Sequence, residues 1–149
     1  LYTPHKKWRL SYNGGVSKYN DDNQKDWNKI NIMYGISPGW PWLWLGLTGE
    51  NLKSKKDIVG YWTPAQFKSY GLKGEGAFPI YKHLSGTFEL QLTKIKEDQN
   101  DWGDASSYFL GLQYGNRDGH YYKFTYSSIN SGQAGSDWKQ KTYFLHIGF

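Results

Sequence analysis

Apolar side chains recur at every second position in segment after segment of this chain, and this alternation limits the folds open to it. In residues 7–12, for example, Trp8, Leu10 and Tyr12 alternate with Arg9 and Ser11. A period of two places successive side chains on opposite faces of a β-strand. The same pattern occurs in residues 27–34, 87–95, 107–114, 120–126 and 139–147, and in residues 41–47 both faces of the expected strand are apolar. The sequence therefore predicts a mainly β fold, with an antiparallel sheet or sheets of about seven or eight strands.

The composition favours the same fold class. The chain has 8 Trp, 13 Tyr and 7 Phe but few alanines, and aromatic residues prefer strands whereas alanine prefers helices. Its 18 glycines supply turns. The 149 residues show no internal repeat and no break in composition, so we expect one domain, residues 1–149, excised from a longer polypeptide.

One segment predicts a helix. Thr63 is a suitable N-cap, Pro64 suits the first helical position, and Gln66 completes a capping box. Phe67 and Tyr70 then lie one turn apart on one face. We expect a short helix over residues 63–71, too short to be stable alone, with the sheet wrapped on it or packed against it.

Several function classes are disfavoured by what the sequence lacks. Without cysteine there are no disulfides, thiol nucleophiles or cysteine-ligated metals. No apolar run approaches the ~18 residues of a transmembrane helix, so we expect no membrane insertion. The four histidines show no paired-ligand spacing, and no nucleophile motif occurs. We expect a non-enzymatic protein with no metal and no cofactor, although two carboxylates facing each other across a cleft would instead indicate a hydrolase.

The polar loops suggest carbohydrate recognition. Three of them end in an Asp-Trp pair, at residues 26–27, 101–102 and 137–138. Sugars are bound by aromatic rings under their C–H face and by polar side chains at their hydroxyls. We expect Trp102 and Trp40 to stack on the sugar. The expected hydroxyl partners are Asn100, Asp101, Asp104, Arg117 and His120.

Two other interpretations of these features stay open. A tryptophan at the start of a strand packs inward in most proteins, so Trp27 and Trp138 fit a core role, and Trp102 fits either role. The net charge of +5 and the aromatic segment 121–126 are also features of single-stranded nucleic-acid binding. However, the basic residues are spread along the chain and are mostly lysine, which is typical of a solvated surface, and we expect no nucleic-acid partner.

The opening residues Leu1-Tyr2-Thr3-Pro4-His5-Lys6-Lys7-Trp8, together with the cysteine-free, aromatic-rich β pattern, resemble the receptor-binding head of a rotavirus outer-capsid spike of the group B type. The resemblance implies a sheet wrapped around a helix and attachment to host-cell glycans that contain galactose or N-acetylglucosamine. It also implies a virion-surface location, with the rest of the spike polypeptide as a partner. An extracellular carbohydrate-binding module of a polysaccharide-degrading enzyme is the alternative.

Overall fold

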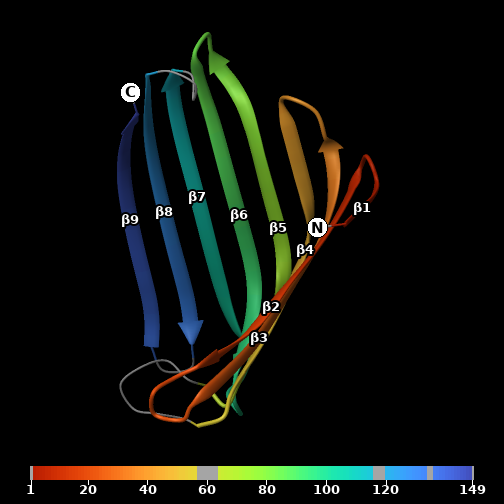
Figure 1. Ribbon diagram of the computed structural model, residues 1–149, viewed down its shortest axis with the longest axis vertical. Helices are drawn as coiled ribbons and strands as arrows, with labels where there is room; N and C mark the ends of the chain where they lie inside the picture. Colours follow the sequence, from red (N-terminus) through yellow and green to blue (C-terminus); the bar gives the residue numbers. More distant parts are fainter. Residues whose placement is uncertain (1, 57–63, 116–119, 134–135, 149) are drawn as a thin grey trace.

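The computed structural model describes residues 2–56, 64–115, 120–133 and 136–148, which form one antiparallel sheet (Figure 1). Each strand pairs with the next along the chain, so the order in space is the order in sequence. The strands are β1 (Tyr2–His5), β2 (Trp8–Lys18), β3 (Gln24–Ser37), β4 (Trp42–Ser54), β5 (Gln66–Tyr81), β6 (Leu84–Glu97), β7 (Gly103–Gly115), β8 (Tyr121–Gln133) and β9 (Ser136–Gly148). The predicted β class and antiparallel pairing are confirmed.

The helix predicted for residues 63–71 is wrong within the part of the chain that the structure describes. Residues 66–71 begin β5, where Phe67 pairs with Leu52 of β4 and Tyr70 pairs with Lys94 of β6. The capping signals act on one helical turn, whereas neighbours on both sides supply hydrogen bonds along the whole strand. Among the residues that the structure describes, the sheet therefore curves without a helix to wrap around.

Several segments whose composition is typical of turns or loops belong to strands. The Asn13-Gly14-Gly15 segment continues β2 instead of closing a hairpin, with Gly14 in register with Asn28. In the polar segment 127–137, residues 127–133 form the end of β8 and residues 136–137 form the start of β9. Apolar side chains do not alternate in these segments, and pairing of the backbone with the neighbouring strand makes them strands.

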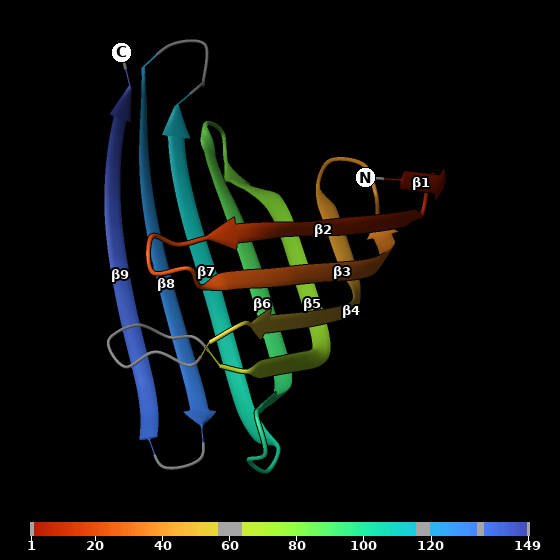
Figure 2. The ribbon, with the colours of Figure 1, turned by 60° about the horizontal axis from the view of Figure 1, so that its bottom comes forward.

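The sheet bends strongly toward one of its faces. Arg9 on β2 donates a hydrogen bond from Nη2 to Oε1 of Glu75 on β5, across β3 and β4. In a flat sheet these strands are about 14 Å apart, so the two side chains meet because the sheet curves toward them. Figure 2 shows the result, with β2 and β3 crossing in front of β5 and β6. We call the face of Arg9 and Glu75 the concave face and the opposite one the convex face.

Two glycines on the concave face allow close contact between neighbouring strands. A Cβ atom on Gly46 of β4 would overlap the carbonyl oxygen of Ile32, and one on Gly71 of β5 would overlap that of Leu92. Glycine inside a strand is typical of a bend where another backbone approaches closely. The bend of the sheet therefore depends on these positions having no side chain.

We expect Gly71→Ala to destabilise the fold by about 1–3 kcal/mol, because the new methyl group overlaps backbone rather than a flexible side chain. Gly49→Ala is the matched control, since a Cβ there lies 3.5 Å from Cγ2 of Ile30, an ordinary contact. Urea denaturation followed by circular dichroism measures both. Equal stability of the two variants would contradict this explanation of the bend.

The buried apolar side chains all belong to the concave face. They are Met33, Leu52, Ala77 and Ile95, each at most 5% exposed. Register places each of them on the same side as Arg9 or Glu75. Met33, for example, is in register with Arg9, and Ala77 lies two residues after Glu75 on β5, on the same face. This small core leaves most of the apolar side chains of the sheet outside it.

Candidate functional site

The convex face carries a continuous band of exposed apolar side chains. Leu72 is 61% exposed and Leu145 is 67% exposed, although both lie in the middle of long strands. We call this surface the convex band. Its exposed members on β2 to β9 are Trp8, Tyr12, Ile30, Ile32, Tyr34, Leu45, Leu47, Tyr70, Leu72, Phe78, Leu90, Leu92, Tyr108, Leu110, Leu112, Tyr114, Tyr122, Phe124, Tyr143, Leu145 and Ile147. Exposed apolar surface of this extent marks a contact surface.

The convex band crosses the strands obliquely. On β5 the band extends to Tyr70, yet the residues in register with Tyr70 on the next two strands are Lys94 and Asp104. On β8 it extends to Tyr126, and the next convex residue, Ser128, is in register with Lys141. The end of the band thus shifts along the strand direction from one strand to the next, so the strands are tilted relative to it.

Aromatic residues with a polar edge gather at both limits of the band. At one limit Trp8 and Tyr34 contact each other edge to face, with ring centroids 5.2 Å apart. At the other limit, the rings of Tyr126 and Tyr143 lie 5.0 Å apart. Tyrosine and tryptophan suit a boundary where one end of the side chain is in an apolar phase and the other is in water.

The concave face combines the small apolar core with an ion-pair network. Besides its contact with Arg9, Glu75 lies 3.3 Å from Nζ of Lys73, which lies 3.2 Å from Oε2 of Glu89. Nε2 of Gln91 donates to Oε1 of Glu89 at 2.7 Å. The side chains of Lys73 and Glu75 are only 14% and 13% exposed. This network is turned to the inside of the bend, and most of the exposed apolar side chains lie on the outside, whereas in a water-soluble sheet charged side chains face outward.

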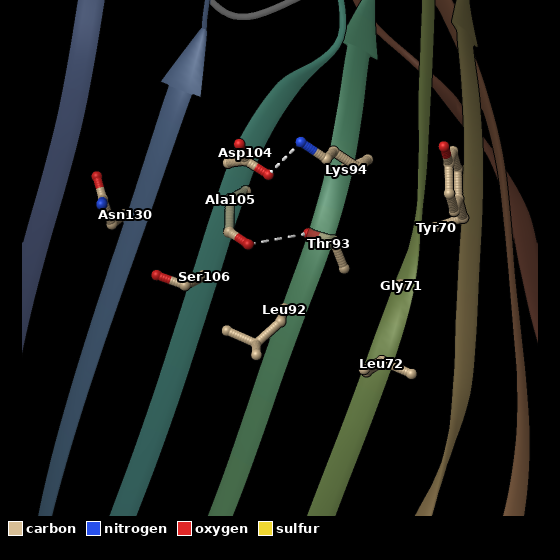
Figure 3. Close-up of a pocket in the computed structure, with 10 residues that line it drawn as sticks. All are labelled: Tyr70, Gly71, Leu72, Leu92, Thr93, Lys94, Asp104, Ala105, Ser106 and Asn130. Atoms are coloured by element: carbon tan, nitrogen blue, oxygen red, sulfur yellow. Dashed lines mark hydrogen bonds and ion pairs between the residues drawn. The ribbon is translucent and has the colours of Figure 1, made fainter.

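A hollow of about 430 Å³ lies on the convex face at the edge of the band (Figure 3). We call it the rim pocket. Apolar Leu72 and Leu92 line one side of it, and the ion pair between Nζ of Lys94 and Oδ1 of Asp104, 2.7 Å long, lies on the other. The remaining lining residues are Tyr70, Gly71, Thr93, Ala105, Ser106 and Asn130.

Four of the seven predicted binding residues lie near the rim pocket. Asp104 lines it, and Trp102, 44% exposed, packs edge to face on Tyr70 with ring centroids 5.0 Å apart. Asn100 and Asp101 are exposed in the connection between β6 and β7. This group is the part of the predicted site that the fold brings together.

The other three predicted residues do not join this group. Trp40 lies in the connection between β3 and β4, and His120 directly precedes β8. Both are at the opposite end of the sheet from Trp102, because alternate connections lie at opposite ends of antiparallel strands, and the 13 residues of β7 span about 43 Å. Arg117 lies outside the described residues.

Sequence reasoning missed Tyr70, Leu72, Leu92 and Lys94 as parts of a site. The sequence contains a pattern that points to Tyr70 and Leu72. Both share the even-numbered positions of β5 with Phe78 and Ile80. Glycines at positions 74 and 76 hide this alternation from a count of apolar residues. The register of β5 with β6, which makes the pocket, is a property of the folded sheet.

Comparison with known proteins assigns no family to this chain. The chain matches no protein-family model, and comparison with curated proteins and with solved structures finds no match. The described residues contain no group of three or more metal-ligating side chains. Among those same residues, no helix has the length and hydrophobicity to cross a membrane.

Proposed function

We propose that this sheet is embedded in a lipid bilayer, with its convex band against the acyl chains and its concave face toward a polar interior. The observation that carries the proposal is the reversed polarity of a curved sheet. A protein partner, including a second copy, meets a convex surface over a limited area and leaves the rest of the band in water. A fluid apolar solvent covers a convex surface everywhere, at a gain of about 25 cal/mol per Å² of apolar area.

The dimensions of the band fit a bilayer. On β6 the convex apolar residues run from Leu84 to Leu92, nine positions that span about 30 Å along the strand. With the ~40° tilt common for membrane strands, this corresponds to a height of about 23 Å, close to the ~25 Å apolar band of such sheets. The oblique course of the band across the strands supports a tilt of this kind.

The aromatic limits and the concave network support the same orientation. Tyr and Trp at both limits match the aromatic residues that lie at the two membrane–water interfaces. The charges of Arg9, Lys73, Glu75 and Glu89 are kept away from lipid and are paired with one another. The proposal requires that β9, and β2 beyond its short pairing with β1, pair with further strands in the bilayer, because unpaired backbone is not tolerated there.

The expectation of no membrane insertion considered only long apolar runs, which a helix needs and a strand does not. A strand crosses a bilayer with apolar side chains on every second residue. The alternation in the sequence is therefore compatible with this proposal. Attachment of a spike head to host glycans stays a prediction that no finding tests.

A single-cysteine series tests the proposal directly, because the natural chain contains no cysteine. Leu110→Cys and Ser107→Cys lie on the convex and concave faces of the same strand, β7. Each is labelled with an environment-sensitive fluorophore and reconstituted in phosphatidylcholine vesicles. We expect the Leu110 label to shift to the blue and to be quenched by lipids that carry a nitroxide in the acyl chain, and the Ser107 label to be quenched by aqueous iodide.

Two results would contradict the membrane proposal. The first is quenching of both labels by iodide in the presence of vesicles. The second is a folded protein that does not sediment or float with vesicles at any lipid concentration. Label-free circular dichroism in the same vesicles checks that each variant keeps the strand content of the natural chain.

A further inference from the structure

The rim pocket lies where the proposed membrane position places the boundary between acyl chains and headgroups. Its apolar side, Leu72 and Leu92, belongs to the convex band, and its polar side, Lys94 and Asp104, lies just beyond the band. A lipid molecule has the same division into an apolar and a polar part. A lipid with its chains along the two leucines therefore places its headgroup against the ion pair.

The charges of the pocket disfavour an anionic headgroup. Lys94 is the cation of the pocket, and its Nζ is 2.7 Å from Oδ1 of Asp104. An incoming phosphate would have to compete with this carboxylate for the ammonium group and would be repelled by it. A neutral headgroup rich in hydroxyls meets no such repulsion, and it uses both the donors of Lys94 and the free acceptor sites of the carboxylate.

Further polar and aromatic groups around the pocket suit hydroxyls. Oδ1 of Asn130 is shielded from solvent, and among the described residues it has no hydrogen-bond partner. Rotation of this amide about its broad terminal torsion offers the unsatisfied acceptor to a donor in the pocket. Ser106, whose Oγ is 3.3 Å from the hydroxyl of Tyr108, supplies a second small polar group. Tyr70 lines the pocket, and Trp102, edge to face against Tyr70 beside the pocket, supplies an exposed ring on which the C–H face of a sugar can stack.

We infer that the rim pocket binds the neutral saccharide headgroup of a membrane glycolipid. The inference rests on the proposed membrane position and adds a ligand class to it. It also gives a role to Trp102 and Asp104, two of the residues expected from sequence to contact sugar. The opposite limit of the band has a comparable aromatic pair, Trp8 and Tyr34, and among the described residues no ion pair accompanies that pair on the convex face.

The test uses the full chain in phosphatidylcholine nanodiscs that contain either digalactosyl diacylglycerol or phosphatidylglycerol, with retained lipid counted by native mass spectrometry. We expect preferential retention of the digalactosyl lipid. Trp102→Ala should weaken retention about tenfold, the effect of losing one stacking contact. Trp8→Ala, which removes the matching ring at the other limit, should leave retention unchanged. Each variant is first checked for natural strand content by circular dichroism.

A second variant covers the case in which Trp102→Ala disturbs folding. Asp104 is 81% exposed, so Asp104→Asn keeps the fold. It leaves Lys94 without its carboxylate partner and should raise retention of phosphatidylglycerol relative to the digalactosyl lipid. Unchanged selectivity in this variant would overturn the inference.

The remaining outcomes separate the two proposals. Equal retention of both lipids by the inserted natural protein overturns the glycolipid inference and leaves the membrane position intact. Competition by free digalactose at the concentration of the glycolipid overturns the lipid source in favour of a soluble saccharide. A folded chain that does not enter nanodiscs overturns the membrane position itself, and the glycolipid inference with it.

Discussion

Leu110→Arg should lower the stability of the sheet in phospholipid vesicles by about 2–4 kcal/mol, the cost of an arginine near the middle of a lipid-facing strand. Leu110 lies within the convex band on β7, between Phe88 and Tyr126. It is 52% exposed, so in water the same substitution would change the stability by only about 0.5 kcal/mol. Urea titration in vesicles, followed by tryptophan fluorescence, measures the difference.

The same strand provides both controls. Tyr108→Arg lies at the limit of the band, where arginine costs only about 0–1 kcal/mol, and Ser107→Arg faces the polar concave side. The lipid-facing arrangement therefore predicts that Leu110→Arg is the most destabilising of the three. A sheet with its convex face in water predicts the opposite order, because Ser107 is the half-buried residue and the other two are exposed. The rank order alone separates the two arrangements.

Strand positions were predictable from sequence wherever one face is apolar and the other polar. Apolar residues occupy every second position in residues 88–92 and 108–114, and these segments lie in β6 and β7. Prediction failed where the side chains do not alternate, as in residues 127–133, because a local sequence pattern gives no information about pairing with a neighbouring strand. The helix expected at residues 63–71 failed for the same reason, since a capping signal of a few residues competes there with two full-length neighbours.

The polarity of the faces was not predictable from alternation. Alternation of apolar and polar residues indicates that one face of a strand is apolar. It gives no information about the direction in which the sheet bends. The bend follows from close contacts at Gly46 and Gly71 and from the ion pair between Arg9 and Glu75. Residues 9 and 75 are far apart in sequence and on strands that do not pair, so only the folded sheet shows that the polar side is concave.

The candidate site was predictable in part for a similar reason. Trp102 and Asp104 lie close together in sequence, and their residue types indicate sugar chemistry. Lys94 and Tyr70 join them through the registers of β5 with β6 and of β6 with β7. Trp40 and His120 matched the same chemistry but lie at the other end of the strands. Residue type thus suggests a chemistry, and strand register decides which residues take part.

Glu75→Gln should cost about 3–5 kcal/mol of stability, the effect expected when one partner is removed from a largely buried ion pair. Glu75 is 13% exposed and contacts both Arg9 and Lys73. Glutamine keeps the shape of the side chain but leaves the Arg9 guanidinium, held 4.8 Å above the ring of Trp44, without its carboxylate. Urea titration of the reconstituted protein measures the loss.

Glu50→Gln is the matched control for Glu75→Gln. Oε2 of Glu50 is 3.9 Å from Nζ of Lys29, and both side chains are 31% exposed, so this pair should contribute less than about 1 kcal/mol. Adding Arg9→Gln to Glu75→Gln should recover part of the stability, because it removes the unpaired cation while Lys73 keeps Glu89. Equal, small losses for Glu75→Gln and Glu50→Gln would show that the concave network is hydrated and does not hold the bend. A large loss at Glu75 with partial recovery in the double variant would mean that the charges hidden on the concave face hold β2 against β5, and with them the curvature that turns the apolar band outward.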